Sequence, residues 1–516
     1  MKKKFLLFLF LCSLGIASGQ TKIKGKITDA VDKTPIIGAL IAEANTNNGT
    51  ISDYDGNYEL TLINDQNALI FSYTGYLDQT KVYNGVNNID VEMQIDEILL
   101  NQVVVVGYGT QKKRDVTSSI TSIKGKDIES IPTSNVEQAL QGKISGVYVS
   151  PSSGRPGDGA VVRIRGTGTL NNANPLYVID GMITYDASLV IPQDVESIEV
   201  LKDASAAAIY GSRGANGVII ITTKSGRNKK EGQISLSTYY GTQEITKEIA
   251  MLDATQFATA YNLLRGQNFY PNPTEFGEGT NYQREIFRKA PIFNTQLSMA
   301  GGNENFNYNF STNYFNQEGI MKMSDFNRVT ARLNLETKVN KFLKIGSHVS
   351  YSTNHAQNGP NVVSSAYRMP PIFAPQKEDG KYTDPTFFGL AIGNPIADLE
   401  YKSNNYSNTK RLFGNFFGEL EIFKDLKFRS NFGFDESSGK SKYFEPIFEV
   451  SGSQRNKSDR LSAALNNAGN WIWEQTLSYT KDISNKHSIT LLAGYTAEER
   501  SSEWLGGSRE NFPGSS

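Results

Sequence analysis

The chain has 516 residues and a formal net charge of −1, because 52 lysines and arginines are balanced by 53 aspartates and glutamates. This balance supplies no basic field for nucleic acid. The one cysteine, Cys12, lies in the leader described next, so disulfides and thiolate metal sites are excluded from the exported chain. The length predicts several domains.

The first residues have the composition of a secretory signal. Lys2–Lys4 form a basic start, Phe5–Leu14 is apolar, and Ala17–Gly19 are small residues at a cleavage site. The apolar run is shorter than the roughly 20 residues of a membrane-spanning helix. We therefore expect residues 1–19 to direct export and to be removed.

Residues 20–95 alternate short strands with turns. The turn Asp53–Asn57 contains two aspartates, but it lacks the further ligands and the distal glutamate of a calcium-binding EF-hand loop, so an ordinary turn is favoured. The expected strands are Lys22–Thr28, Ile36–Glu43, Gly56–Leu62, Ala68–Tyr73 and Ile89–Met93. We interpret this region as a small β-domain without catalytic residues.

Residues 96–114 contain the run Gln102–Tyr108, with four consecutive valines at Val103–Val106. Valine is stiff at χ1 and favours an extended backbone, whereas Gly107, Gly109 and the basic residues after them loosen and solvate the chain. Two interpretations remain on these residues alone. The run is either a core strand of a neighbouring domain or a tethered strand that binds the sheet edge of a partner through main-chain hydrogen bonds.

Residues 115–226 form a mixed α/β segment. The glycine-rich stretches Gly166–Gly168 and Gly142–Lys143 lack the remaining residues of dinucleotide- or phosphate-binding loops, so we interpret them as turns. The expected elements are a helix at Asn135–Leu140, strands at Val161–Gly166, Leu176–Gly181, Val195–Leu201 and Val218–Thr223, and a helix at Asp203–Tyr210.

Residues 227–516 show the two-residue period of strands with one apolar and one polar face. Clear examples are Asn305–Phe315, Arg328–Val339 and Arg411–Ile422. Strands of this length suit a bilayer, and without long apolar helices a closed β-barrel is the remaining way to span one. The alternative is a large soluble β-sandwich. Residues 357–404 are irregular and are expected to form a long loop.

The residues show no catalytic pattern. His348, His355 and His487 are scattered and lack the spacing of a zinc site, and there is no Gly-x-Ser-x-Gly elbow. Glu419 and Glu421 share one strand face, where they suit a wet lumen lining better than the carboxylate pair of a glycosidase. We therefore assign no enzyme activity, no cofactor and no metal.

Several segments together resemble a known family. The motifs are Val103–Gly109, Asn135–Gly146, Arg163–Gly166, Pro175–Gly181 and Ala208–Lys224. In this order and spacing they resemble the SusC/RagA type of TonB-dependent outer-membrane receptor. Upstream, the segments Pro35–Ala39, Thr50–Tyr58 and Phe71–Tyr76 resemble the carboxypeptidase-regulatory-like β-sandwich, a small transthyretin-type domain.

The resemblance implies a mainly β fold in four parts after the signal peptide. These are a transthyretin-like β-sandwich at 20–95, a TonB box and linker at 96–114, an α/β plug at 115–226, and the first part of an antiparallel outer-membrane β-barrel at 227–516. It places the protein in the outer membrane, in contact with lipid, with the N-terminal domain and the TonB box in the periplasm. The residues expected to contact TonB are Gln102, Val103, Val104, Val105, Val106, Gly107 and Tyr108.

The implied function is TonB-dependent active import of an oligosaccharide or a peptide, with a SusD-like surface lipoprotein as a lid. TonB would use inner-membrane energy to pull on the valine strand and open the plug. Two alternatives remain. A signal-transducing receptor would need a dedicated N-terminal signalling domain, and a passive porin or adhesin would need neither plug nor valine strand.

Three structural expectations follow from this assignment. Val103–Val106 should be mobile in the isolated protein and become a strand on TonB. Arg163 and Arg165 should point the same way from one strand and face carboxylates on the barrel wall, the alternative being a solvated pair. The sheet should stay open, because we count about ten strands against roughly 22 in plugged transporters. Trp504–Ser516 should form a loop, and an unpaired edge strand should lie near residue 498.

Overall fold

The computed structural model describes residues 21–44, 46–63, 68–73, 76–94, 103–106, 109–112, 120–227, 231–388, 392–484 and 487–511. The predicted signal peptide, residues 1–19, lies outside these ranges. The chain divides into two compact units, residues 1–117 and residues 118–516. Within the described ranges, no helix is long and apolar enough to cross a membrane.

The N-terminal unit contains the predicted β-sandwich. One sheet has the strand order β4–β1–β7 and the other has the order β3–β2–β5–β6. The strands are β1 (Lys22–Asp29), β2 (Leu40–Glu43), β3 (Gly49–Ile51), β4 (Asn57–Thr61), β5 (Ala68–Ser72), β6 (Gln79–Val82) and β7 (Val91–Met93). Alternation sets the burial of β1, since Ile23 and Ile27 are buried whereas Lys24 and Lys26 are exposed.

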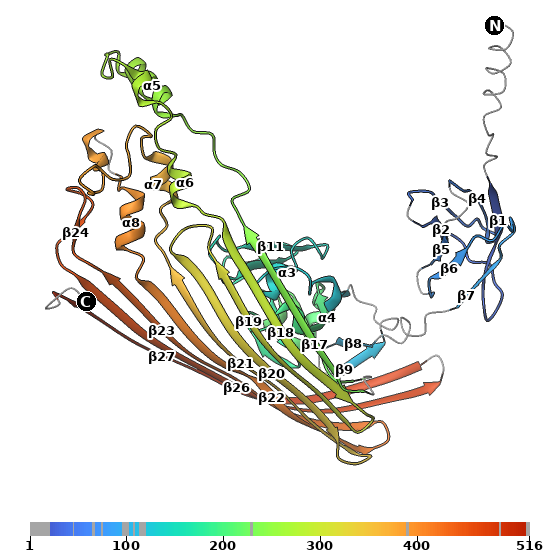
Figure 1. The fold of residues 1–516 in the computed structure, drawn as a ribbon. Helices are drawn as coiled ribbons and strands as arrows, with labels where there is room; N and C mark the ends of the chain where they lie inside the picture. The colour runs from blue at the N-terminus through green and yellow to red at the C-terminus, as the bar shows by residue number, and fades with distance from the viewer. Residues whose placement is uncertain are drawn as a thin grey trace, which may run out of the picture. The chain divides into compact units, whose positions relative to one another are not determined.

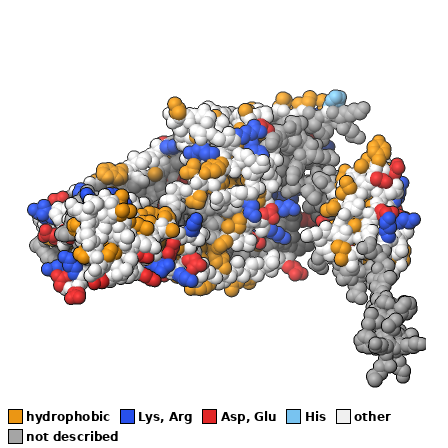
Figure 2. Space-filling view, turned by 90° about the horizontal axis from the view of Figure 1, so that it is seen from above, with side chains coloured by type: hydrophobic (Ala, Val, Ile, Leu, Met, Phe, Trp, Pro, Cys, Tyr) orange, Lys and Arg blue, Asp and Glu red, His pale blue; other side chains and the backbone are white. Residues whose placement is uncertain are grey.

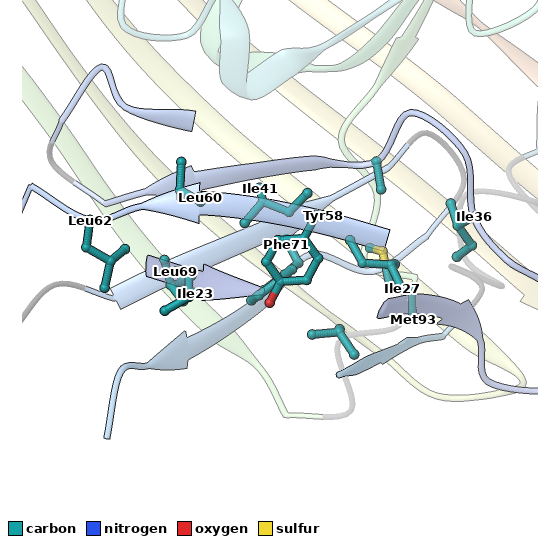
Figure 3. Close-up of a cluster of buried hydrophobic side chains, with 12 residues drawn as sticks. Ile23, Ile27, Ile36, Ile41, Tyr58, Leu60, Leu62, Leu69, Phe71 and Met93 are labelled. Carbon is teal, nitrogen blue, oxygen red and sulfur yellow. The ribbon is translucent and has the colours of Figure 1, made fainter. Parts of the chain in front are cut away.

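Large apolar side chains from both sheets fill the core of this sandwich (Figure 3). The rings of Tyr58 and Phe71 meet edge to face with their centroids 5.6 Å apart. Each fully buried side chain of this size contributes about 1.5–3 kcal/mol. The acidic turn before β4 is an ordinary turn, because the carboxylate of Asp53 accepts the backbone N–H groups of Asp55 and Asn57.

The valine run is already a strand. β8 (Val103–Val106) pairs antiparallel with β9 (Gly109–Lys112), from Val103 opposite Lys112 to Val106 opposite Gly109. Two residues separate the strands, which is the spacing of a β-hairpin. In this structure the run is therefore paired within the chain, and its mobility in the isolated protein stays a prediction. Gln102, Gly107 and Tyr108 lie outside the described residues.

Residues 120–227 form the predicted α/β plug. Its sheet has the order β10–β15–β16–β13–β14, in which β13 and β16 are parallel and the other pairs are antiparallel. The elements are β10 (Ile120–Lys124), α3 (Val136–Ala139), β11 (Val147–Pro151), β12 (Ala160–Ile164), β13 (Leu176–Ile179), β14 (Met182–Thr184), β15 (Val195–Leu201), α4 (Ala204–Ala207) and β16 (Val218–Thr223). The β13 strand is buried along its whole length, and β16 is buried except at one residue, because both are runs of apolar residues.

Nine long antiparallel strands follow, side by side in chain order, and we call this sheet the wall (Figure 1). They are β17 (Gln233–Gln243), β18 (Ala290–Gly302), β19 (Phe306–Glu318), β20 (Ser324–Lys338), β21 (Leu343–Asn358), β22 (Asn405–Phe423), β23 (Leu426–Glu445), β26 (Arg460–Ser484) and β27 (His487–Glu510). On the outer face, alternate apolar residues such as Val329 and Leu333 are exposed, as expected of a surface that meets lipid.

The two ends of the wall differ. Short turns join the strands at one end, whereas the other end carries the long segments with α5 (Ala254–Arg265), α6 (Tyr282–Ile286), α7 (Val363–Arg368) and α8 (Pro395–Tyr401) (Figure 1). Helices α6–α8 pack together through a buried apolar cluster. Seen from above relative to Figure 1, the described charged side chains of both signs are mixed with hydrophobic ones on this face (Figure 2).

The described strands leave the sheet open. Each of β17 and β27 has a neighbour on one side only, so the predicted edge strand near residue 498 is confirmed. The expected loop at Trp504–Ser516 is wrong in its first part, because β27 continues to Glu510 and Trp504 lies opposite Asn466. The partner strand β26 supplies main-chain hydrogen-bond partners along this whole stretch, which outweighs the two glycines in it.

Candidate functional site at the interface of plug and wall

The inner face of β20 is a continuous row of plug contacts. Every second residue from 326 to 336 points inward, by the two-residue period of a strand. Five of these six side chains are polar or charged, and all are buried. The row consists of Phe326, Arg328, Thr330, Arg332, Asn334 and Glu336. We call these six residues the β20 row.

A buried arginine lies at the centre of the row. The Arg332 side chain is 2% exposed and lies between two plug carboxylates, 3.5 Å from Asp180 Oδ2 and 3.5 Å from Asp194 Oδ2. Two further wall residues bind Asp194 Oδ1, namely Gln296 at 2.6 Å and Ser311 at 2.8 Å. Because a buried charge without partners costs several kcal/mol, these groups hold each other in place.

Asp180 is positioned by an unusual backbone. It has φ of +50°, which places it in the left-handed region just after β13. Its carboxylate accepts the backbone N–H of Thr223 at 2.8 Å and the Thr223 hydroxyl at 2.7 Å. These bonds offset the strain and point the carboxylate towards the wall.

Towards the long-loop end, the row binds plug backbone. Arg328 donates to the carbonyl oxygens of Ser188 at 2.9 Å and Ser134 at 2.6 Å. The Phe326 ring lies against Gly157, where a Cβ atom would come within 2.3 Å of it and where φ is +76°. A side chain at position 157 would therefore push the plug away from the wall.

Towards the short-turn end, the row binds the segment that leaves the plug. Asn334 donates to Thr223 Oγ1 at 2.7 Å and to the carbonyl of Lys224 at 3.0 Å. Arg227 binds Glu336 through Nε at 2.8 Å and Nη2 at 2.5 Å. This two-nitrogen geometry is a strong form of ion pair, so the end of the plug is anchored to the wall.

Other strands of the wall also bind the plug. Asn415 of β22 and Asn431 of β23 donate to the carbonyls of Asp180 and Gly181. Arg213 of the plug pairs with Glu498 of β27 at 2.8 Å. Polar contacts between the plug and the wall therefore extend from β18 to β27.

One buried carboxyl lies within the plug itself. Glu137 of α3 is 6% exposed, and it accepts hydrogen bonds from the Ala187 backbone and the Tyr177 hydroxyl. Burial, with a smaller contribution from the charge of Asp186, raises the pKa of Glu137 to about 7. Burial also raises the pKa of Tyr177, so its hydroxyl stays protonated as the donor.

The predicted arginine contacts lie elsewhere. Arg163 donates to Asn174 Oδ1 at 2.6 Å and to the carbonyl of Val162, and Arg165 pairs with Asp203 at 2.5 Å. All of these partners belong to the plug, so the expectation that both arginines face carboxylates on the wall is corrected. Arg165 follows the end of β12 and has φ of +56°, which removes it from the two-residue period on which the expectation rested.

We expect the double substitution Arg163→Ala with Arg165→Ala to leave the plug as tight as in the parent receptor. The reason is that neither side chain has a described partner on the wall. Single-channel conductance of the purified receptor in planar bilayers measures this. A leak in the double variant would show that these arginines hold the plug after all.

The sequence contained a signal for the β20 row. The alternation of Arg328, Arg332, Asn334 and Glu336 with apolar residues was visible, and it predicted one polar face. The alternation named no partner for that face, and the structure buries it against the plug. Polarity alone does not distinguish a wet surface from a buried polar interface. In the described ranges, no group of three or more His, Cys, Asp or Glu could hold a metal ion.

The comparisons with known proteins agree with this architecture. The TonB-dependent Receptor Plug Domain model matches residues 112–218, and the CarboxypepD_reg-like domain model matches residues 23–105. The chain is 36% identical to TonB-dependent receptor P3 of Formosa agariphila, over 97% of this chain and 50% of that protein. It is 37% identical to TonB-dependent receptor SusC of Bacteroides thetaiotaomicron, over 63% of this chain and 33% of that protein.

A solved structure has a similar fold over most of this chain. The RagAB peptide importer in the open-open state superposes with a TM-score of 0.70 at 26% identity, over 80% of this chain and 50% of that chain. A plug, a strand wall and a regulatory-like β-sandwich define a TonB-dependent receptor of the outer membrane. Within that class, the chain belongs to the SusC/RagA type. It spans about half the length of the curated relatives first matched.

Proposed function

We propose that this protein imports a nutrient across the outer membrane with energy delivered by TonB. The observation that carries the proposal is the β20 row, where Arg328, Arg332 and Glu336 hold the plug by ionic and polar contacts. Separating an apolar interface would expose its whole apolar surface to water, which raises the free energy. Polar contacts exchange for contacts with water, so a plug held in this way can move without the wall unfolding.

The parts of the chain fit this function. We assign residues 20–95 to the regulatory β-sandwich, 96–114 to the TonB box and linker, 115–226 to the plug and 227–516 to the barrel. The short turns lie at the periplasmic end and the long segments at the extracellular end, as in other outer-membrane barrels. TonB would contact the run from Gln102 to Tyr108. No catalytic role is assigned.

The description of one solved structure suggests a kind of cargo. RagAB is described as a peptide importer, and SusC is a TonB-dependent receptor. We propose a SusD-like lipoprotein as the lid over the long loops and an oligosaccharide or peptide as the cargo. A passive porin is disfavoured because Arg332 and its neighbours hold a plug against the wall.

Uptake in whole cells tests the function. Strains with and without this gene are grown on oligosaccharide and peptide mixtures as sole carbon source, each in a background with and without TonB. We expect growth to need both proteins and to stop when a protonophore removes the proton-motive force. Growth that needs the receptor but not TonB would identify a passive channel.

We expect Val104→Pro to abolish uptake without lowering the amount of receptor in the outer membrane. Proline removes a ladder donor and restricts the backbone of a strand that TonB must pair with. A matched control is Gln111→Pro, which lies opposite Val104 in the hairpin and leaves the valine donors intact. If Gln111→Pro supports uptake and Val104→Pro does not, the TonB contact lies on β8. Normal uptake by Val104→Pro would move the TonB contact elsewhere.

A further inference from the structure

One plug loop is surrounded by arginines from three strands of the wall. It comprises residues 184–188, and we call it the 184–188 loop. Arg411 of β22 binds Asp186 Oδ2 at 2.5 Å, and Arg328 of β20 donates to the carbonyl of Ser188. Arg500 of β27 lies over the Tyr185 ring, 4.8 Å from its centroid.

The two carboxylates that bind Arg411 differ in their exposure and in how many nitrogens of Arg411 they bind. Asp435, on the neighbouring wall strand, is 15% exposed and accepts from Arg411 Nε at 2.6 Å and Nη2 at 2.5 Å. Asp186 is 52% exposed and accepts one hydrogen bond from Arg411, from Nη1. Its other hydrogen bonds come from the backbone N–H and the hydroxyl of Ser188 in the same loop. Water reaches the Asp186 carboxylate, and this exposure weakens its attraction to Arg411 relative to that of Asp435. Asp435 is therefore a fixed partner of Arg411, and Asp186 is a replaceable one.

The loop faces the side from which cargo arrives. Arg328 and Arg411 lie in the first halves of β20 and β22, and both strands start at the long-loop end of the wall. Tyr185 is 41% exposed, so an aromatic ring, a cation and an exchangeable carboxylate stand together there. This combination suits a ligand that brings its own carboxylate.

The inner side of the same loop is tied to α3. The Ala187 backbone N–H donates a hydrogen bond to the buried carboxyl of Glu137. Arg328 joins the two segments again, because it binds the carbonyls of both Ser188 and Ser134. In the chain, α3 follows β10, the first described strand of the plug after the valine hairpin. A shift of the 184–188 loop therefore acts on the N-terminal part of the plug.

We propose that the 184–188 loop senses cargo through a carboxylate that replaces Asp186 on Arg411. The proposal rests on the import function above and adds the chemical class of the cargo, an acid. Displacement of Asp186 removes one wall contact of the loop and loosens its hold on α3. Neutral hydroxyl groups form weaker bonds to a guanidinium than a carboxylate does, so a neutral cargo does not displace Asp186. The carboxylate comes from a uronate unit of an oligosaccharide or from the C-terminus of a peptide.

Binding to the purified full-length receptor tests the class of cargo. The probes are an oligogalacturonate and its methyl ester, and a mixed peptide library with free C-terminal carboxyls and the same library amidated. We expect at least one acid to bind about tenfold or more tightly than its neutral form, by calorimetry. The sugar arm and the peptide arm distinguish the two sources. Equal binding, or no binding, of acid and neutral forms in both arms overturns the proposal.

The variant Asp186→Asn gives a signature that simple damage to the site does not. It removes the carboxylate that competes for Arg411, so the acid probe should bind tighter, by up to about fivefold for a pair worth at most about 1 kcal/mol. Amide exchange at residues 136–140 should also become faster without any probe. The matched control is Asp203→Asn, which breaks the Arg165–Asp203 pair elsewhere in the plug.

The outcomes separate this proposal from the import function. If Asp186→Asn behaves like Asp203→Asn in both measurements, the sensing role is wrong even when cells still need TonB for uptake. If cells show no TonB-dependent uptake, the import function fails, whatever the probes do in vitro. Weaker acid binding by Asp186→Asn would also overturn the proposal, because Asp186 would then be a ligand rather than a competitor.

Discussion

Arg332→Ala is expected to loosen the plug and let small solutes leak through the receptor. The substitution leaves Asp180 and Asp194 facing each other across a buried space without their common cation. Removing one partner of a buried ion pair costs about 3–5 kcal/mol, which is a large share of the stability of a domain of the plug's size. The wall itself should still form, because its main-chain pairing does not involve the side chain.

The leak is measured as conductance of the purified receptor in planar bilayers and as sensitivity of cells to antibiotics that porins exclude. Arg288→Ala is the matched control, since Arg288 pairs with Glu318 of the wall at 3.0 Å and is half-exposed. Arg332→Lys should give an intermediate leak, because the charge remains but the planar fork is lost. A variant Arg332→Ala that is as tight as the parent would mean that the other contacts of the row suffice.

The sequence predicted the fold well because period and composition are local properties. The alternation in Arg328–Val339 predicts a strand and its two faces, and both appear in β20. The small β-sandwich followed from short alternating runs such as β1. The hairpin at β8 was not predicted, because its second strand Gly109–Lys112 begins with glycine and lacks apolar residues that alternate with polar ones.

The partners at the interface could not be predicted in the same way. Asp180 and Arg332 are far apart in the chain, and nothing local says which polar residue of one segment meets which of another. The expectation placed the cations on the plug, at Arg163 and Arg165, and the anions on the wall. At the centre of the interface the structure has the reverse, with Arg332 on the wall and two aspartates on the plug. Charge complementarity was the right principle, but its direction depends on the tertiary fold.

Glu137→Gln is expected to stabilise the plug at pH 8 and to leave it nearly unchanged at pH 5. Burial raises the pKa of Glu137 from its ordinary value of 4.5 to about 7, so the folded plug binds this proton more tightly than the unfolded chain does. Its contribution to stability is therefore fully present below about pH 4.5 and is lost as the pH rises towards about 7. The free energy of unfolding that the plug loses in this way is at most about 3 kcal/mol.

Amide hydrogen exchange at residues 136–140 of the full-length receptor, corrected for the intrinsic effect of pH, measures this change. The parent should exchange faster at pH 8 than at pH 5, because the ionised carboxylate is buried beside Asp186. Glutamine keeps an oxygen acceptor for Ala187 and carries no charge, so the variant should show little difference between the two pH values. Glu196→Gln, at an exposed position of β15, should keep the behaviour of the parent. The same pH dependence in Glu137→Gln and the parent would assign the titration to another group.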